Sequence, residues 1–310
     1  MIGLFSASKQ LGWLVVELDE RTARYVHGRA HPSGKSAITL FGSRALEAPA
    51  DAEKLAKELR CAGYSCATLL KPGDYQVLMV EAPNVPPEER KAAVRWRLKD
   101  LLDYPVDNAT IDVLDIPPPS EGVAERSHQI FAVAARNDLI QGRIKRFDDA
   151  RIPLTVIDIP ETAQRNIGAL YEQADRGLAL LYAGDESCLL TVNFRAELIL
   201  CRRIDIGLRQ FRADALREEA FNRVVLELQR TFDLIDRQFQ YAPVAKLLLA
   251  PTPEDTGLAG YLRENIGIAV ETIDLAASLA FNGKGAPDAA TQWRLFHLFG
   301  AALRHAAKAL

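Results

Sequence analysis

The chain has 310 residues, 48% hydrophobic and 25% charged, which is ordinary globular composition in a length sufficient for two cores. A formal net charge of -3 leaves no excess of basic side chains for a phosphate backbone, which argues against a nucleic-acid partner. No apolar run approaches the roughly 18 residues of a membrane span, and the start lacks a signal peptide's charged region and cleavage site. We therefore expect a cytoplasmic chain without a transmembrane helix.

The cysteines and histidines show no metal-binding or catalytic pattern. The cysteines contain no Cys-x-x-Cys pair, so buried free thiols are expected at Cys61, Cys66, Cys188 and Cys201. No histidine has a partner at helical spacing, and we assign no catalytic or metal role to His27, His31, His128, His297 or His305.

The first sixty residues predict three antiparallel strands followed by a helix. Apolar runs at 13–18, 23–27 and 37–41 are separated by turn-forming residues. A helix is expected over 51–62, with Asp51 as its N-cap and Gly63 at its end. Gly34-Lys35-Ser36 resembles the end of a phosphate loop, but five residues rather than four separate it from Gly28, and a strand follows where a helix is needed. A hairpin turn is the better interpretation.

The next ninety residues predict a small α/β module. A strand at 75–81 ends in a proline turn, and a helix over 87–103 follows, with an apolar stripe at Val94, Leu98, Leu101 and Leu102. Pro105 ends that helix, and strands at 109–115 and 128–135 lead to a helix at 138–150. The turn-rich segment 117–122 is the best candidate for a mobile loop.

After a strand at 154–159 and a helix at 161–171, the three-strand pattern starts again, at 178–183, 188–193 and 198–203. This restart indicates an internal repeat of architecture. A long helix at 214–239 places Phe221, Val224, Val225, Leu228 and Phe232 on one core-facing stripe. A strand at 246–249, a helix at 258–266, a strand at 269–273, a loop at 282–287 and a final helix at 293–308 complete the chain.

Several of these segments together resemble a known family. They are Pro86-x-Glu-Glu-Arg-x-x-Ala-Val-Arg-Trp96, Tyr104-Pro105-Val106-Asp107, the strand that carries Asp112, and the runs 131–136, 154–161, 226–233 and 300–304. Their order is similar to that in the cytoplasmic pilus-assembly proteins of the PilM type, and within them to the MshI branch of mannose-sensitive haemagglutinin (MSHA) pilus biogenesis. No single motif is specific, but their order covers nearly the whole chain.

The resemblance implies an actin-like fold: two lobes of duplicated ribonuclease-H-like architecture, with a small α/β subdomain inserted into the first. The expected parts are residues 1–63 and 151–175 for the first lobe and 64–150 for the inserted subdomain. Residues 176–280 form the expected second lobe, and a C-terminal helix within 281–310 returns to the first.

The resemblance also implies three nucleotide-contacting turns, and each departs from the pattern. The first, Glu17 to Thr22, has Asp19 where the family has a glycine, so it adds bulk and a negative charge. In the second, Tyr182 replaces an aspartate, although Gly184 remains. In the third, Ala250 and Pro251 replace glycines. We therefore hypothesise a pseudo-ATPase with a degenerate site that needs no cofactor; ATP and magnesium would bind only if this site still functions.

The implied function is that of a non-catalytic adaptor. PilM-type proteins bind the cytoplasmic N-terminal tail of a single-pass inner-membrane protein of the PilN or MshJ type, in a groove beside the inserted subdomain. Trp96 is the leading candidate anchor for this tail, with Arg95, Arg97 and Tyr104 around it. The alternative is that Trp96 covers the core of the subdomain itself.

Two other functions stay open. The first is an active ATPase or kinase-type enzyme on the same fold, which nucleotide-dependent thermal stabilisation would reveal. The second is the cytoplasmic domain of a GspL-like type II secretion protein, which the lack of a membrane span disfavours. The adaptor is expected to lie in the cytoplasm, associated with the inner membrane through its partners, with the pilus motor ATPase as a possible further partner.

Overall fold

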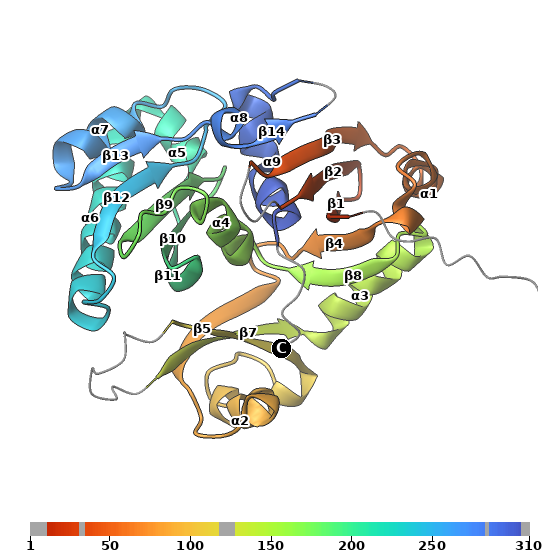
Figure 1. Ribbon diagram of the computed structural model, residues 1–310, viewed down its shortest axis with the longest axis horizontal. Coiled ribbons are helices and arrows are strands. Elements are labelled where there is room, and N and C mark those ends of the chain that lie inside the picture. The colour runs from red at the N-terminus through yellow and green to blue at the C-terminus, as the bar shows by residue number, and fades with distance from the viewer. Residues whose placement is uncertain (1–10, 31–34, 118–127, 283–284, 305–310) are drawn as a thin grey trace, which may run out of the picture. The chain divides into compact units, whose positions relative to one another are not determined.

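The computed structural model describes residues 11–30, 35–117, 128–282 and 285–304. The chain folds into two compact units (Figure 1). The first unit comprises residues 1–116, 124–160 and 301–310, and the second comprises residues 117–123 and 161–300. Each unit is therefore assembled from separate stretches of the chain.

The larger sheet of the first unit starts as an antiparallel meander of β1 (Trp13–Leu18), β2 (Thr22–Arg29) and β3 (Ala37–Ala45). Strands β4 (Ser65–Leu69) and β8 (Leu154–Asp158) continue it in parallel, in the order β3-β2-β1-β4-β8. Successive side chains of a strand point to opposite faces, so Leu14, Val16 and Leu18 share one face, where they pack with Phe147. The expected hairpin between β2 and β3 is confirmed, although residues 31–34 lie outside the described part.

Helix α1 (Pro49–Glu58) differs at both ends from the predicted helix over 51–62. Asp51 lies inside the first turn, where its carboxylate accepts the backbone N–H groups of Glu47 and Ala48, both at 2.9 Å. Arg60 adopts a left-handed conformation, with φ of 53°, and a short 3-10 turn (Cys61–Gly63) follows. The helix therefore ends before Arg60 rather than at Gly63.

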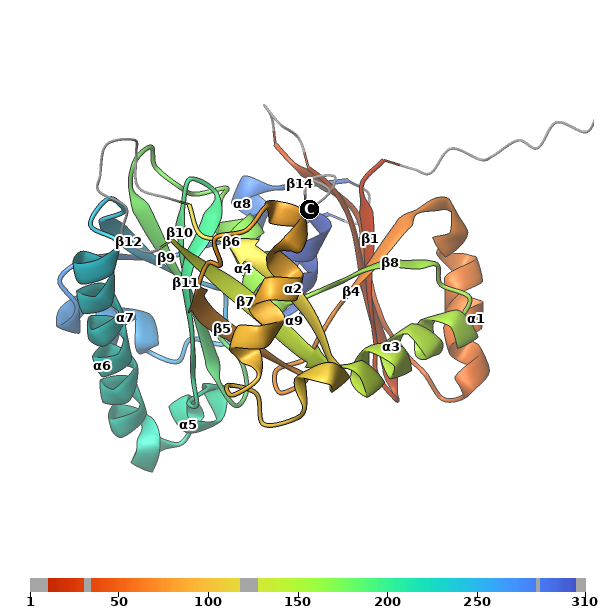
Figure 2. The same ribbon diagram turned by 90° about the horizontal axis from the view of Figure 1, so that it is seen from below.

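A second, three-stranded antiparallel sheet in the first unit contains β5 (Tyr75–Glu81), β6 (Ala109–Asp115) and β7 (Gln129–Arg136) in the order β5-β7-β6. Helix α2 (Pro87–Leu98) lies across one face of this sheet (Figure 2). Val94 and Leu98 of α2 are fully buried there against Val80, Val113 and Ile130. On the sheet's other face, residues of β7 pack with Ile140 of helix α3 (Asn137–Asp149).

Helix α2 is shorter than the predicted helix over 87–103. It ends at Leu98, whose carbonyl oxygen accepts the N–H groups of Leu101 at 3.0 Å and Leu102 at 3.1 Å. Leu102 still packs against the subdomain core, but the side chain of Leu101 is 53% exposed. The predicted apolar stripe is therefore correct at Val94, Leu98 and Leu102 and wrong at Leu101.

The later part of the chain has one five-stranded sheet and several helices. The strands are β9 (Gly177–Ala183), β10 (Cys188–Phe194), β11 (Glu197–Ile204), β12 (Val244–Leu249) and β13 (Ala269–Thr272). The other elements are α4 (Pro160–Gly168), α5 (Leu208–Arg212), α6 (Asp214–Gln238), α7 (Leu258–Asn265), α8 (Leu275–Ser278), β14 (Ala280–Phe281) and α9 (Ala289–Ala302). Four of the five predicted core residues of α6 are buried and Phe232 is half-buried.

The two halves of the chain repeat one topology, which confirms the predicted internal repeat. The five-stranded sheet of the second unit has the order β11-β10-β9-β12-β13, which corresponds strand for strand to β3-β2-β1-β4-β8 in the first unit. In both, three antiparallel strands come first in the chain, and two parallel strands extend the sheet from the first of them.

Several boundaries differ from those expected. Strand β4 pairs with β1, so the inserted sheet and α2 span Tyr75 to Arg136, a narrower segment than 64–150. Residues 161–175 and 281–300 group with the second unit rather than with the first. Helix α9 begins and ends earlier than the predicted 293–308, and the predicted loop residues 118–122 and 283–284 lie outside the described residues. Within the described segments, no helix is long and apolar enough to cross a bilayer.

Candidate functional site

The turn between β1 and β2 is closed by a hydrogen bond from the N–H of Asp19 to the carbonyl of Thr22, at 2.8 Å. Two carboxylates flank it. Glu17 and Arg24 are cross-strand partners, and Nη1 of Arg24 lies 2.9 Å from Glu17 Oε2 and 3.2 Å from Asp19 Oδ2. Lys71, which follows β4, forms a further ion pair with Asp19. Both carboxylates therefore have basic partners from within the first unit.

The equivalent turn in the second unit, between β9 and β10, retains Gly184 but has Tyr182 where an acidic residue was expected. The N–H of Gly184 donates to the carbonyl oxygen of Ser187, at 3.0 Å. The carbonyl oxygen of Gly184 accepts the N–H of Leu208, at 2.8 Å. Tyr182 donates its hydroxyl to the carbonyl of Trp293, at 3.2 Å, and its ring stacks on Phe296 with centroids 5.3 Å apart. Tyr182 thus packs on α9 and cannot supply the carboxylate that magnesium prefers.

The third predicted turn follows β12. Ala250 donates its N–H to Leu181, at 2.9 Å, and both Ala250 and Pro251 are buried. Proline has no N–H to offer to a ligand, and both side chains add atoms beside the backbone. The turn therefore lacks the open backbone that a glycine run would provide.

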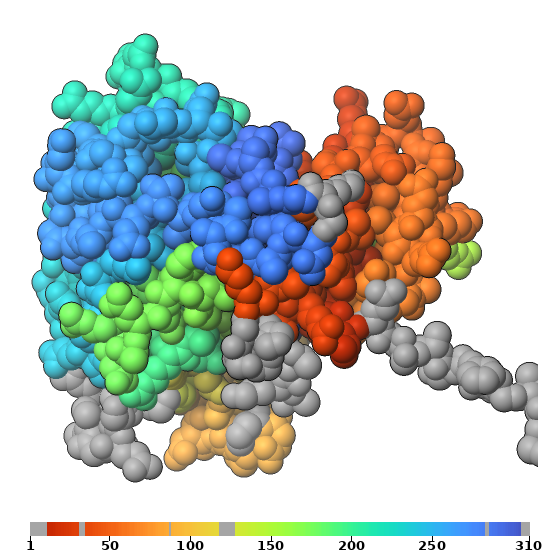
Figure 3. All heavy atoms as spheres, turned by 45° about the horizontal axis from the view of Figure 1, so that its top comes forward, coloured from red at the N-terminus to blue at the C-terminus, as the bar shows by residue number. Residues whose placement is uncertain are grey.

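A cavity of about 720 Å³ opens beside this third turn, entirely within the second unit. It lies at the carboxyl ends of the parallel strands β9, β12 and β13, which is where open α/β sheets bind ligands. Leu181, Leu249 and Ile273 give it an apolar floor, and its volume suits a small molecule. Figure 3 shows the blue segment after β12, which supplies most of the lining, on the surface of this unit.

Arg212 connects the second and third turns. Its Nη1 lies 3.5 Å from Asp185 in the β9–β10 turn, and its Nε forms an ion pair with Glu254 beyond Pro251. Sequence reasoning missed Arg212 and Lys71, because their acidic partners lie 27 to 52 residues away in the chain. Arg24 could have been found, since the predicted hairpin register places it opposite Glu17.

The first two turns follow the corresponding strands β1 and β9 of a repeated sheet, and this repeat decides the fold. The chain has the actin-like fold. Two solved structures share it: the PilM–PilN type IV pilus biogenesis complex (TM-score 0.70, 19% identity, 95% of this chain and 99% of that chain), and a Bacteroides thetaiotaomicron protein with an actin-like ATPase fold and unknown function (TM-score 0.50, 9% identity, 90% and 96%). The cytoplasmic domain of EpsL from the Vibrio cholerae type II secretion system matches at TM-score 0.49, with 12% identity over 94% and 93%. No protein-family model and no curated protein matches the chain.

The four residues predicted to bind a partner have different surroundings in this actin-like fold. Trp96 is 77% exposed on α2, so the alternative that it covers the subdomain core is wrong. Arg95 donates to the carbonyls of Val106 and Ala109, at 2.6 and 3.1 Å, and so fixes the segment between α2 and β6.

Arg97 and Tyr104 also differ from each other. Arg97 lies 3.5 Å from Glu81 and is 41% exposed. Tyr104 is half-buried beneath the guanidinium of Arg136, and its hydroxyl has no hydrogen-bond partner within the described residues. Trp96 and Arg97 are therefore presented outward, whereas Arg95 and Tyr104 support the subdomain.

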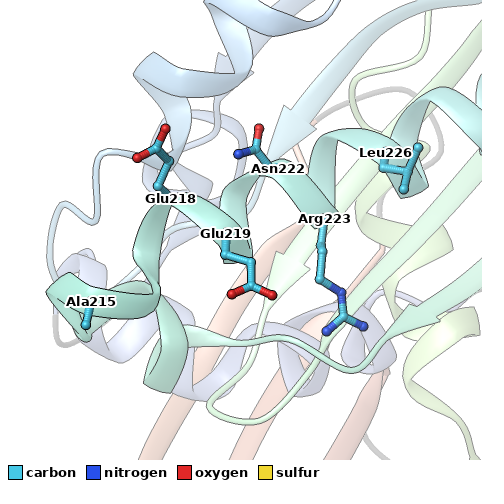
Figure 4. A pocket seen from close by; sticks show the side chains of 6 residues that line it. All are labelled: Ala215, Glu218, Glu219, Asn222, Arg223 and Leu226. Carbon is cyan, nitrogen blue, oxygen red and sulfur yellow. The ribbon is translucent and has the colours of Figure 1, made fainter.

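A groove of about 480 Å³ on α6 shows no convergence of reactive groups (Figure 4). Its six lining residues all come from this one helix: Ala215, Glu218, Glu219, Asn222, Arg223 and Leu226. Glu218 and Asn222 point to one side of the helix, and Glu219 and Arg223 to the other. The described residues also contain no cluster of three or more potential metal ligands.

Proposed function

We propose that this chain is a non-catalytic adaptor of a type IV pilus assembly platform. It binds the cytoplasmic N-terminal tail of a single-pass inner-membrane protein of the PilN or MshJ type, in an MSHA-type system. The observation that carries the proposal is the similarity to a PilM–PilN complex over 95% of this chain. The inserted subdomain, which presents Trp96 on α2, offers the surface for the tail. The adaptor then lies in the cytoplasm, held at the inner membrane by this partner, and the pilus motor ATPase is a further candidate partner.

The exposure of Trp96 supports its role as an anchor. A tryptophan side chain that is 77% exposed contributes little to folding. When a partner covers it, however, a large apolar surface is removed from water, which favours binding. Aromatic anchors of this kind often dominate binding energy at peptide interfaces. An extended tail can also pair its backbone with a sheet edge while its apolar side chains fill pockets.

Trp96→Ala is expected to weaken binding of the partner tail at least tenfold, equivalent to about 1.4 kcal/mol, with little change in melting temperature. The ligand is a synthetic peptide with the N-terminal cytoplasmic residues of the PilN/MshJ-type protein from the same genome, and fluorescence anisotropy measures its affinity. Leu216→Ala is the control, since Leu216 is 49% exposed on α6 and belongs to the other unit. Unchanged affinity in Trp96→Ala would refute the anchor, and absence of any peptide binding by the unmodified protein would refute the proposal.

We also propose that the chain does not use ATP. The ion pairs of Glu17 and Asp19 support this, because a magnesium ion would have to compete with Arg24 and Lys71 for these two carboxylates. Tyr182, Ala250 and Pro251 support it in the second unit by removing a carboxylate and backbone space. Isothermal titration with Mg-ATP is expected to give no heat of binding. A micromolar dissociation constant would instead favour the ATPase or kinase alternative.

The GspL-type alternative is not better supported by the comparisons than the PilM-type one. The EpsL domain shares 12% identity with this chain, against 19% for the PilM–PilN complex. The titration with the tail peptide also separates these two functions, because it uses a pilus-type tail.

A further inference from the structure

We infer that α6 pairs with α6 of a second copy of this chain, antiparallel and about a two-fold axis. The contact surface is a stripe of four residues on the exposed side of the helix, here called the α6 stripe: Leu216, Glu219, Arg223 and Leu226. The inference goes beyond the proposed binding of a partner tail, which uses the first unit. It rests on the spacing of the stripe, on its exposure, and on the order of its apolar and charged residues.

The α6 stripe has the spacing of a helix–helix contact. Its members follow one another at intervals of three, four and three residues, which is the a/d pattern of a heptad repeat and places them along one side of the helix. The buried residues of α6, among them Val224 and Leu228, lie on the other side, which packs within the second unit. The stripe is therefore a second face of α6, separate from the face that holds the helix in the fold.

The α6 stripe is also open to a partner. Leu216 and Leu226 are 49% and 44% exposed, and Glu219 and Arg223 are exposed between them. Figures 1 and 2 both show α6 along the margin of the second unit. The shallow groove of about 480 Å³ on this helix includes Glu219, Arg223 and Leu226 in its lining (Figure 4). A helix from a second copy can therefore lie along this face.

The two charged residues of the stripe differ from their neighbours on α6. Arg217 pairs with Asp214 and Arg230 pairs with Glu227, each within the same helix. In the part of the chain that the structure describes, neither Glu219 nor Arg223 has an ion-pair partner. These two side chains are thus available to a partner of opposite charge without breaking an existing ion pair.

The order of residues along the stripe is self-complementary in the antiparallel direction. Leu216 and Leu226 lie at equal distances in sequence from position 221, and so do Glu219 and Arg223. A two-fold axis beside this position makes every contact reciprocal. It places Leu216 of each copy against Leu226 of the other, and Glu219 of each copy against Arg223 of the other. The same chain therefore supplies both halves of a matched surface.

Each of these contacts favours the antiparallel pair. The leucine pairs remove apolar surface from water at both ends of the contact, and Glu219 and Arg223 form charge-assisted hydrogen bonds between them. A parallel pair in register would place Glu219 against Glu219 and Arg223 against Arg223, which repulsion between like charges opposes. Because each copy contributes only four side chains, the interface is small, and we expect a weak dimer with a dissociation constant on the order of 100 μM.

The test is sedimentation velocity of the full chain from about 5 to about 500 μM, over which the unmodified chain should shift from monomer towards dimer. Glu219→Arg and Arg223→Glu each place like charges at both central contacts, so each variant alone should dimerise about tenfold more weakly. An equimolar mixture of the two variants should regain the dimer, because one copy then carries two arginines and the other two glutamates. An unchanged melting temperature verifies the folding of each variant.

Cysteine cross-linking tests the direction of the pair. Leu216→Cys mixed with Leu226→Cys should give a disulfide-linked dimer under copper–phenanthroline oxidation, and neither variant alone should do so. In a dimer of Leu216→Cys alone, the new thiols lie about 15 Å apart along the helix axes, at about 1.5 Å per residue, which no disulfide can bridge. The unmodified chain measures any background from its native cysteines, three of which are buried.

The matched control is Glu264→Arg, which reverses one exposed carboxylate on α7 in the same unit and should leave the dimer unchanged. A monomeric unmodified chain at about 500 μM, undiminished dimer in either charge variant, no recovery in their mixture, or equal cross-linking of one cysteine variant alone would each overturn the inference. Leu216→Ala should weaken the dimer but not the binding of the partner tail, so failure of one interface is distinguishable from failure of the other.

Discussion

Gly300→Ala is expected to lower the free energy of unfolding of the second unit by about 3 kcal/mol. Gly300 lies on α9 against α4, and a Cβ atom at this position would lie 2.1 Å from the carbonyl oxygen of Ala163 and 2.7 Å from its carbonyl carbon. Both obstacles are backbone atoms, so no side-chain rotation can relieve the clash. The two helices would have to move apart and lose close packing around the buried Ala163 and Ile167.

A hydrogen bond adds to the cost of this separation. Nδ2 of Asn166 on α4 donates to the carbonyl oxygen of Gly300, at 3.0 Å. If α9 shifts, this hydrogen bond breaks, and leaving its donor and acceptor buried without a partner lowers the stability. The close approach of α4 and α9 at Gly300 therefore depends both on close packing against Ala163 and on the hydrogen bond from Asn166.

Gly260→Ala is the matched control, since Gly260 lies in α7 and a Cβ there would meet no atom within 4 Å. Alanine favours helix over glycine by about 1 kcal/mol, so this variant should be neutral or more stable. Urea denaturation of both variants measures the difference. Equal stability of the two would show that α4 and α9 do not depend on close backbone contact at Gly300.

The strands of this fold could be predicted from the sequence because their signal is local. Trp13–Leu18 and Tyr75–Glu81 were predicted at the bounds observed, since each apolar run ends at turn-forming residues. The repeat was predicted for the same reason, because two triplets of strands share their spacing. The strand Ser65–Leu69 was missed, although it is mostly buried, because it lies in a short stretch that was grouped with the inserted module.

Other features depend on contacts that no local pattern reveals. The end of α2 at Leu98 is one example. The apolar spacing continues to Leu101 and Leu102, although the helix has already ended and the backbone there forms a turn. The left-handed Arg60 is another, since glycine rather than arginine is expected in that conformation. At the candidate site, the predicted turns were located, but the basic residues that neutralise Asp19 and Glu254 became visible only in three dimensions.

Lowering the pH from about 7.5 to about 5 is expected to cost the second unit between about 1 and 2 kcal/mol through His297 alone. The ring of His297 packs at 4.4 Å from that of Tyr182, and its Nε2 lies 3.2 Å from Oε1 of Gln164. Because the amide nitrogen of Gln164 already donates to the carbonyls of Leu180 and Leu189, its Oε1 is an acceptor, and His297 must donate from Nε2.

Burial is the main cause of the pH dependence. Burial and, to a smaller extent, the positive charge of Arg203 together lower the pKa of His297 to about 3. The unfolded chain takes up a proton near pH 6.5 and the folded chain does not, so stability falls as the pH decreases from about 6.5 towards about 3. The ring keeps some contact with water, which reduces the cost at pH 5 below the full 2 kcal/mol.

His297→Gln removes the titrating group and leaves an amide that can still donate to Gln164, so its melting temperature should fall less than that of the unmodified chain between the two pH values. His27, whose pKa burial also lowers, lies in the first unit and contributes equally to both proteins. His128→Gln is the control, since the side chain of His128 is 40% exposed. If His297→Gln and the unmodified chain lose the same stability on acidification, the pKa of His297 in the folded chain is not lowered enough to make folding pH-dependent. The hydrogen bonds around Gln164 would then tolerate a charged imidazolium.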